Sequence, residues 1–239
     1  MGDDLRPWRE QAQDSHLLRA VAHWTDDPDK WLEAALPRLF ETIRINPLRR
    51  EFRWTQKQIL DMGAQKIEWC PNGWVMPWVR GSIPQIHREL FIALHETGRI
   101  TRQEAVSMIP SLLLDISNDD IVLDMCASPG SKSTHIAEIL QGSGAVIAND
   151  VSKKRTNTLV ANAQRISLPN IIIVQHDGRH IPKIPGEGYD AILVDAPCTG
   201  SATTRKNPDV WTKWLPSAGK KLHSLQLDLL SRAIKISRP

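Results

Sequence analysis

Ile121-Val-Leu-Asp-Met-Cys-Ala-Ser-Pro-Gly-Ser-Lys-Ser-Thr-His-Ile136 predicts a buried strand, a tight turn and the start of a helix. The apolar run ends near Asp124, Pro129-Gly130 supplies the turn, and Ser131 to Ser133 can cap the helix. At the carboxyl end of a strand in an open parallel sheet, free backbone N–H groups face the crevice where doubly wound folds bind ligands. The stretch therefore predicts a cofactor-binding turn.

The glycine content of this turn narrows the class of cofactor. Gly130 is its only glycine, whereas a dinucleotide fingerprint needs several and a P-loop closes with Gly-Lys-Ser/Thr. A cofactor without phosphate groups needs less bare backbone, and S-adenosylmethionine fits that description. An acidic residue for a ribose is expected about 20 residues further on, and Asp150 lies 20 positions past Gly130. Asp150 could equally cap the helix that follows it.

Four motifs follow one another along the chain: Leu123-Asp-Met-Cys-Ala-Ser-Pro-Gly-Ser-Lys132, Asn149-Asp150, His176-Asp-Gly178 and Asp195-Ala-Pro-Cys-Thr-Gly200. In this order they resemble the motifs of the Sun-domain RNA 5-methylcytosine methyltransferases. The resemblance runs from about residue 39 to the last residue. It implies an α/β fold, in which a Rossmann-like S-adenosylmethionine-dependent methyltransferase sheet follows a smaller N-terminal α/β RNA-binding domain.

Two branches of that family share further segments with this chain. Residues 98–110 are similar to the eukaryotic tRNA branch, whereas Trp69-Cys70 and Arg205-Lys-Asn-Pro208 resemble the bacterial 16S rRNA branch. The resemblance therefore implies methylation of RNA at carbon 5 of cytosine, with tRNA favoured over rRNA. The alternatives are a catalytically inactive RNA-binding or assembly homologue and a protein methyltransferase, which would need no Pro-Cys motif.

Composition sets the outer limits of the class of protein. The chain has 239 residues, of which 41% are hydrophobic and 24% charged, values typical of a globular protein without a membrane span. The three cysteines are too far apart for a disulfide framework or a zinc site, which indicates a reducing compartment. No secretory segment is apparent, so we expect an intracellular protein of the nucleus or cytoplasm. The net charge of +3 does not by itself indicate that the protein binds nucleic acid.

The patterns divide the chain into an N-terminal extension (1–38), an RNA-binding domain with connecting helices (39–110) and a partial methyltransferase domain (111–239).

Continuous apolar runs at 171–175 and 190–195 predict strands covered on both faces. Helical spacing predicts a helix at 84–96 with a stripe of Ile86, Leu90 and Leu94, and another around 222–236. Thr101-Arg-Gln-Glu104 predicts a capping box. His87 and His95 are interpreted as structural, and no metal is expected.

Basic residues suggest where RNA would bind. An apolar alternation carries Arg44, Arg49 and Arg50, which suits either a strand whose outer face binds phosphates or a solvated charged face. Arg205 and Lys206 begin a basic stretch interleaved with tryptophans that suits a flipped base and its flanking phosphates. The tryptophans before residue 80 could stack bases, but core positions are the simpler interpretation for most of them.

The resemblance also implies roles for individual residues. Asp150 would bind the ribose hydroxyls, Asp177 would accept from the adenine amino group, and Asp195 and Arg155 would complete the cofactor site. The cofactor turn itself would consist of Cys126, Ala127, Ser128, Pro129, Gly130, Ser131 and Lys132.

Catalysis in this family is understood to need two cysteines, because cytosine carbon 5 becomes nucleophilic only after a thiolate adds at carbon 6. By this resemblance, Cys198 matches the Pro-Cys cysteine, which assists release of the product. Asp195 matches the residue that binds the edge of the cytosine, and Lys132 matches a residue near the target base. Alternatively, Cys198 is a small buried hydrophobe. Thr199-Gly-Ser-Ala202 departs from the family pattern, which leaves the contacts of this loop open.

The attacking cysteine of the family belongs to a Thr-Cys or Ser-Cys motif that would follow Pro239. By position, neither Cys70 nor Cys126 corresponds to it. We therefore expect a fragment, one half of a split enzyme or an inactive homologue, with the attacking thiol supplied by a partner chain or a further segment.

Overall fold

A computed structural model describes residues 6–184 and 186–238. By its contacts the chain forms two compact units, one of residues 1–39 and 197–227 and the other of residues 40–196 and 228–239. This division differs from the three segments expected from the sequence, because the extension joins the segment after Ala196 and both sheets share one unit. The helix α10 (Ser217–Ile236) contributes to both units.

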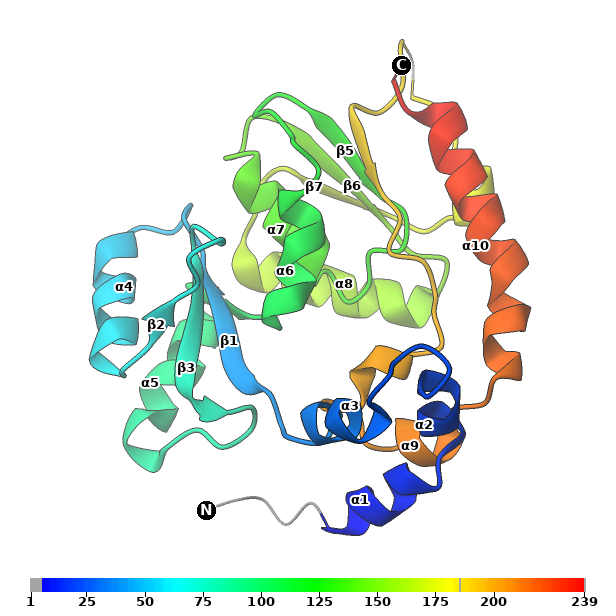
Figure 1. Cartoon of the computed structure of the whole chain (residues 1–239). Helices are drawn as coiled ribbons and strands as arrows, with labels where there is room; N and C mark the ends of the chain where they lie inside the picture. The colour runs from blue at the N-terminus through cyan, green and yellow to red at the C-terminus, as the bar shows by residue number, and fades with distance from the viewer. Residues whose placement is uncertain (1–5, 185, 239) are drawn as a thin grey trace. The chain divides into compact units, whose positions relative to one another are not determined.

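The larger unit holds a parallel sheet of the predicted methyltransferase type (Figure 1). Its strands are β5 (Ile121–Asp124), β6 (Ala145–Asn149), β7 (Ile171–Val174) and β8 (Ala191–Leu193), in the order β7-β6-β5-β8. All three neighbouring pairs are parallel. Because the order reverses beside β5, the carboxyl end of this strand lies at the switch point where open α/β sheets bind ligands. The Rossmann-like fold predicted from the sequence is confirmed.

Helices α7 (Ser131–Ile139) and α8 (Lys153–Ile166) connect these strands and pack on the sheet. Ile171 and Ile173 of β7 join their core, while Ile172 between them is 52% exposed. The prediction that this strand is covered on both faces is therefore wrong. Since side chains alternate along a strand, two helices on one face of an edge strand leave the other face open.

The same unit contains a small antiparallel sheet of order β2-β3-β1-β4. Its strands are β1 (Phe40–Ile45), β2 (Gln65–Lys66), β3 (Gly73–Val79) and β4 (Ile100–Arg102). Helices α4 (Phe52–Asp61) and α5 (Gln85–Glu96) flank the sheet, and Trp74 and Trp78 belong to its core. The core interpretation of these two tryptophans is confirmed, whereas Trp24 is an exposed side chain.

Two local predictions in this region are wrong. Ile86 is 86% exposed, whereas Leu90 and Leu94 of the expected stripe pack on the core together with Phe91. The supposed capping box is largely strand β4, and α6 (Ala105–Leu112) begins after Glu104 without a side-chain cap. The capping box does not form because β4 pairs with β1, and strand pairing uses the backbone groups that a capping box would need. Pro110 lies inside α6 and does not end it.

The smaller unit is built from α1 (Arg6–Gln13), α2 (His16–Val21), α3 (Pro28–Ala35) and α9 (Val210–Lys213). Trp211 is buried in its core, where the rings of Trp31 and Trp211 meet edge to face at 5.9 Å. A short 3-10 turn at Ser201–Thr203 also belongs to the smaller unit, and another at Gly178–His180 belongs to the larger unit. In the part of the chain that the structure describes, no helix combines the length and apolar character needed to cross a membrane.

Candidate active site

An aspartate stands at or just after the carboxyl end of each strand of the parallel sheet. Asp124 ends β5, Asp150 follows β6, and Asp177 and Asp195 follow β7 and β8. Because neighbouring parallel strands end at the same edge, these four carboxylates mark one rim of the sheet. We call them the aspartate rim.

The turn after β5 is shaped by a glycine that no other residue can replace without strain. Gly130 has φ +103°, and a Cβ there would lie 2.7 Å from Cδ1 of Leu159 on α8. The first intrahelical bond of α7 runs from the Thr134 N–H to the Gly130 oxygen at 2.9 Å. The N–H groups of the first helical turn have no intrahelical acceptor, so the start of α7 can face an electron-rich ligand.

Asp124 is the buried member of the aspartate rim. Its Oδ2 accepts a hydrogen bond of 2.6 Å from Ser133 Oγ, while its Oδ1 is buried without a partner among the described residues. Burial raises the pKa of Asp124 to about 6, the nearby charge of Asp195 adds to this, and the bond from Ser133 opposes it. Neither Asp124 nor Ser133 was predicted as a site residue, although Asp124 ends the quoted apolar run.

Asp150 is 2% exposed and holds the turn together. Its Oδ2 accepts from the Ser128 N–H at 3.3 Å and its Oδ1 from the Ser152 N–H at 2.9 Å. Arg155 pairs with Asp150 at 3.3 Å and donates to the Ser128 oxygen at 2.8 Å. Ser152, not Asp150, is the N-cap of α8, so the interpretation of Asp150 as a mere helix cap is wrong.

Asp177 and Asp195 are the more accessible members of the rim, and each faces a cation. Arg179 donates from Nε and Nη2 to Asp177, with the Nη2 bond at 2.6 Å, and this hydrogen bonding lowers the pKa of Asp177. Lys132 Nζ lies 2.6 Å from Asp195 Oδ2. The structure therefore brings together Lys132 and Asp195, two residues 63 positions apart that the sequence assigned to one site. Arg179 was missed, although it follows the His-Asp-Gly motif directly.

The three cysteines differ sharply in environment. Cys70 is buried against the sulfur of Met108, and burial raises the pKa of its thiol. Burial, together with Asp124 and Asp150, raises the pKa of Cys126 to about 12. Cys198 is exposed, so its interpretation as a buried hydrophobe is wrong. Because the thiolate is the nucleophile, Cys70 and Cys126 are poor candidates for attack on a base.

One predicted RNA contact is wrong. Arg44 on β1 is 0% exposed and forms an ion pair with Glu138 of α7, with Nε 3.0 Å from Oε2. It also donates to Thr134 Oγ1 and to the Ser131 oxygen. The alternation of β1 was identified correctly, but β1 is an interior strand of its sheet and α7 covers the face that carries Arg44. This arginine cannot reach a phosphate.

The other basic residues predicted to bind RNA are more accessible. Arg49 is half-buried, with its Nη2 donating to the Arg165 oxygen at 3.2 Å, while Arg50 is exposed. In the smaller unit, Arg205 donates from Nε to the Pro37 oxygen at 2.9 Å and Lys206 is exposed. Among the described residues, no group of three or more His, Cys, Asp or Glu side chains is placed to hold a metal ion.

A comparison of the sequence with known families covers the segment that contains the aspartate rim and the single-glycine turn. The family model described as 16S rRNA methyltransferase RsmB/F matches residues 111–239, more than half of the chain. The chain belongs to this family.

Curated relatives include both tRNA and rRNA enzymes. The chain is 38% identical over 164 residues to the multisite-specific tRNA:(cytosine-C(5))-methyltransferase of Saccharomyces cerevisiae, covering 62% of this chain and 24% of that protein. It is 33% identical over 215 residues to ribosomal RNA small subunit methyltransferase F of Aliivibrio salmonicida, covering 88% of this chain and 45% of the relative. The chain thus spans less than half the length of these relatives.

A solved structure supports the fold. A methyltransferase homologue from Pyrococcus horikoshii superimposes with a TM-score of 0.71 at 28% identity, covering 90% of this chain and 67% of that chain. Because 90% of this chain is covered, the likeness extends beyond residues 111–239 into the region of the small antiparallel sheet.

Proposed function

We propose that the chain is the cofactor-binding and base-binding part of an S-adenosylmethionine-dependent methyltransferase that modifies carbon 5 of cytosine in RNA. The observation that carries this proposal is the Lys132–Asp195 pair at 2.6 Å. Lys132 belongs to the first turn of the helix after the cofactor turn, and Asp195 begins the Asp-Ala-Pro-Cys motif. One ion pair therefore joins the cofactor turn to the motif for the base.

The aspartate rim fits the proposed cofactor. S-adenosylmethionine is a sulfonium cation that also carries an ammonium group, and bound here it would supply an electrophilic methyl group. Carboxylates complement positive charge, and Arg155, Arg179 and Lys132 show that three of the four already pair with cations. Asp124 Oδ1, a buried acceptor without a partner among the described residues, suits an ammonium donor. Asp150 and Asp177 remain the proposed partners of the ribose and the adenine.

The proposed roles of Asp195 and Lys132 at the target cytosine follow from their charges and from the exposure of Asp195. A carboxylate accepts hydrogen bonds from the amino edge of cytosine, and Asp195 is the exposed carboxylate of the rim. Lys132 forms an ion pair with Asp195, and its ammonium group can stabilise negative charge that develops on the ring once a thiolate has added to carbon 6. Cys198 then assists release of the methylated product.

The attacking thiol is proposed to come from outside these residues. Cys70 is buried and the pKa of Cys126 is about 12, so neither supplies a thiolate near neutral pH. A further segment or a partner chain would contribute the attacking cysteine. The catalytically inactive RNA-binding homologue stays the alternative, and it predicts RNA binding without any methylated product.

Two kinds of RNA are possible substrates. We favour tRNA, because the tRNA methyltransferase of yeast is the relative with the higher identity, 38% against 33% for the rRNA enzyme. Two findings favour rRNA instead: the rRNA enzyme aligns over a longer segment, and the family is described by 16S rRNA. The assay below therefore includes both.

The test is methyl transfer from labelled S-adenosylmethionine to unmodified tRNA and 16S rRNA transcripts, with a segment carrying the second cysteine supplied. Mass spectrometry of nucleosides should find 5-methylcytosine. Lys132→Met and Asp195→Asn should abolish the product, whereas Asp119→Asn, at an exposed aspartate before β5, should not. RNA binding without product in the wild type would favour the inactive homologue, and equal product in all variants would remove the ion pair from the site.

A further inference from the structure

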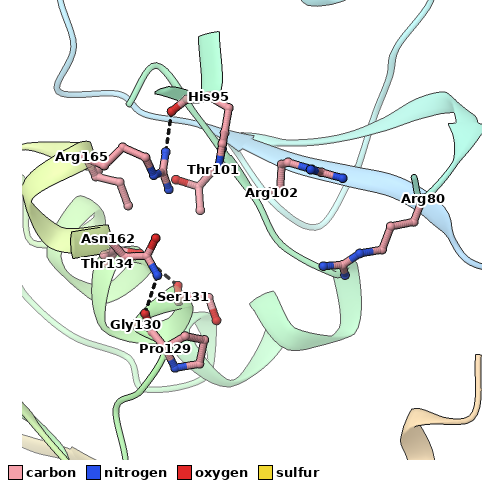
Figure 2. A pocket seen from close by; sticks show the side chains of 11 residues that line it. Arg80, His95, Thr101, Arg102, Pro129, Gly130, Ser131, Thr134, Asn162 and Arg165 are labelled. Atoms are coloured by element: carbon pink, nitrogen blue, oxygen red, sulfur yellow. Dashed lines mark hydrogen bonds between the residues drawn. The ribbon is translucent and has the colours of Figure 1, made fainter. Parts of the chain in front are cut away.

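A cavity lies beside the cofactor turn, inside the larger unit. Its volume is about 250 Å³, and Pro129, Gly130 and Ser131 form one wall. The opposite wall comes from β4, α5 and the residue after β3, as Figure 2 shows. None of the four aspartates of the rim lines it, so this cavity shares only residues of the turn with the proposed cofactor site.

The cavity is positively charged. Arg80, Arg102 and Arg165 line it, and no carboxylate does (Figure 2). Arg102 is paired with Glu41, and Arg165 donates through Nη1 to the His95 oxygen at 2.6 Å. For Arg80 the structure gives no hydrogen bond or ion pair with any described residue. Arg80 is therefore a cation available to a ligand.

Buried donors without acceptors line the same cavity. Thr101 is 4% exposed, and its Oγ1 has no hydrogen-bond partner among the described residues. The Nε of Arg102 is likewise buried and unpaired. A buried polar group left without a partner costs about 1–3 kcal/mol, so a ligand rich in acceptor oxygens would recover this cost. The start of α7, at Gly130 and Ser131, adds the positive end of a helix dipole.

We propose that this cavity binds a backbone phosphate of the RNA substrate. A phosphate offers several acceptor oxygens and a negative charge, and guanidinium groups bind it through paired N–H donors. The cavity could hold about eight water molecules at ~30 Å³ each, which also leaves room for part of an adjoining sugar. Because the cofactor turn forms one wall, the phosphate bound here belongs to the strand that carries the target base. This inference rests on the proposed function, since RNA is the ligand.

His95 supplies an independent reporter of the bound phosphate. Burial lowers the pKa of His95, and the charges of Arg165 and Arg102 lower it further, while Glu96 opposes them. A phosphate between these arginines would add negative charge next to the imidazole and raise its pKa. NMR of histidine-labelled protein can follow this change without any measurement of activity.

Two variants and one control test the site through RNA affinity. Arg80→Gln removes the unpaired cation, and Thr101→Val removes the unpaired hydroxyl while keeping the shape of the side chain. Arg88→Gln removes the same charge at an exposed position of α5 outside the cavity. Fluorescence anisotropy with labelled tRNA transcript over a salt series gives the affinity of each chain and its salt dependence.

Arg80→Gln should weaken RNA binding by about five- to eightfold at ~0.1 M salt and reduce the slope of log affinity against log salt by about 0.7–0.9, the effect of one lost phosphate contact. Thr101→Val should also weaken binding, yet unfold at the same or higher denaturant concentration, because its hydroxyl has no partner to lose. Arg88→Gln should keep the wild-type slope. RNA should raise the pKa of His95 in the wild type and in Arg88→Gln, but not in Arg80→Gln.

The outcomes separate this inference from the function on which it rests. If the wild type binds no RNA, the proposed function itself is wrong. If the wild type binds RNA and both cavity variants bind with unchanged affinity and slope, only the phosphate site is wrong. Inorganic phosphate at the same phosphate concentration should leave His95 unchanged, and an equal rise in its pKa would assign the cavity to free phosphate and overturn the RNA proposal.

Discussion

At the scale of single residues, the aspartate rim shows how one residue type takes different roles according to its surroundings. Asp124 is buried and Asp150 is pinned by two backbone N–H groups, whereas Asp177 and Asp195 each face a cation. Asp124 and Asp150 thus help to shape the turn, whereas Asp177 and Asp195 present the more accessible carboxylate groups.

The first prediction concerns the cofactor. Asp177→Ala and Asp150→Asn should each weaken S-adenosylmethionine binding by about 1–3 kcal/mol, as for other hydrogen bonds to charged groups. Asparagine keeps the size of Asp150, so the turn it supports is disturbed as little as possible. Isothermal titration calorimetry measures the effect, with Asp119→Asn as the control. Equal affinities in all four chains would remove both aspartates from the cofactor site.

The second prediction concerns pH and stability. Burial raises the pKa of Asp124 from 3.8 to about 6. Between pH 3.8 and about pH 6, the Asp124 carboxyl is therefore mostly protonated in the folded state and mostly ionised in the unfolded state. Stability contributed by this group is present below about pH 4 and is lost as pH rises to about 6, amounting to roughly 3 kcal/mol at most. Asp124→Asn carries no such charge and should therefore be more stable than the wild type at pH 7.5.

Urea denaturation at pH 4.5 and pH 7.5, without cofactor, measures this difference. The gain in Asp124→Asn should shrink at the lower pH, where the wild-type carboxyl is mostly protonated. A gain of the same size at both pH values would show that ionisation of Asp124 does not govern it.

At the scale of elements, the ion pair of Arg44 and Glu138 links β1 of the small sheet to α7 of the parallel sheet. Both side chains are buried, and the two residues are 94 positions apart. The small sheet and the start of the cofactor helix are thus held together by charge as well as by packing. Asn46 adds a second link, since its Nδ2 donates to the oxygens of Gly98 and Ile166.

The third prediction tests that link. Glu138→Gln or Arg44→Met alone should destabilise the chain by about 3–5 kcal/mol, because each leaves the other charge buried without its partner. The double variant Arg44→Met with Glu138→Gln should recover much of the loss, since no charge then remains buried. Denaturation of the four chains forms a double-mutant cycle. Additive losses would show that the two side chains stabilise the fold independently.

At the scale of the whole molecule, the distribution of thiols determines what the chain can do by itself. Of its three cysteines only Cys198 is exposed, and the pKa of Cys126 is about 12. Cys198 is proposed to act in product release, and the raised pKa values of Cys70 and Cys126 make both poor nucleophiles for attack on carbon 6.

The fourth prediction follows. With labelled cofactor and tRNA, the 239-residue chain should give no methylated cytosine, whereas a longer chain with the Thr-Cys or Ser-Cys motif should. Cys198→Ala in the longer chain should accumulate a covalent protein–RNA adduct, seen as a slow band on a denaturing gel, because the adduct forms but is not released. Methylation by the short chain that is lost in Cys198→Ala would instead make Cys198 the attacking residue.

The sequence by itself determined the strand, turn and helix around Gly130, the order of the motifs and the amphipathic α10, because these depend on periodicity and turn chemistry among neighbouring residues. It also placed Lys132 and Asp195 in one site, through the resemblance. Tertiary structure alone decided that Arg44 is buried against Glu138 and that β4 replaces a capping box. It also decided that Arg80 and Thr101 line one cavity. Burial and charge pairing depend on partners far away in the chain, and no local pattern carries that information.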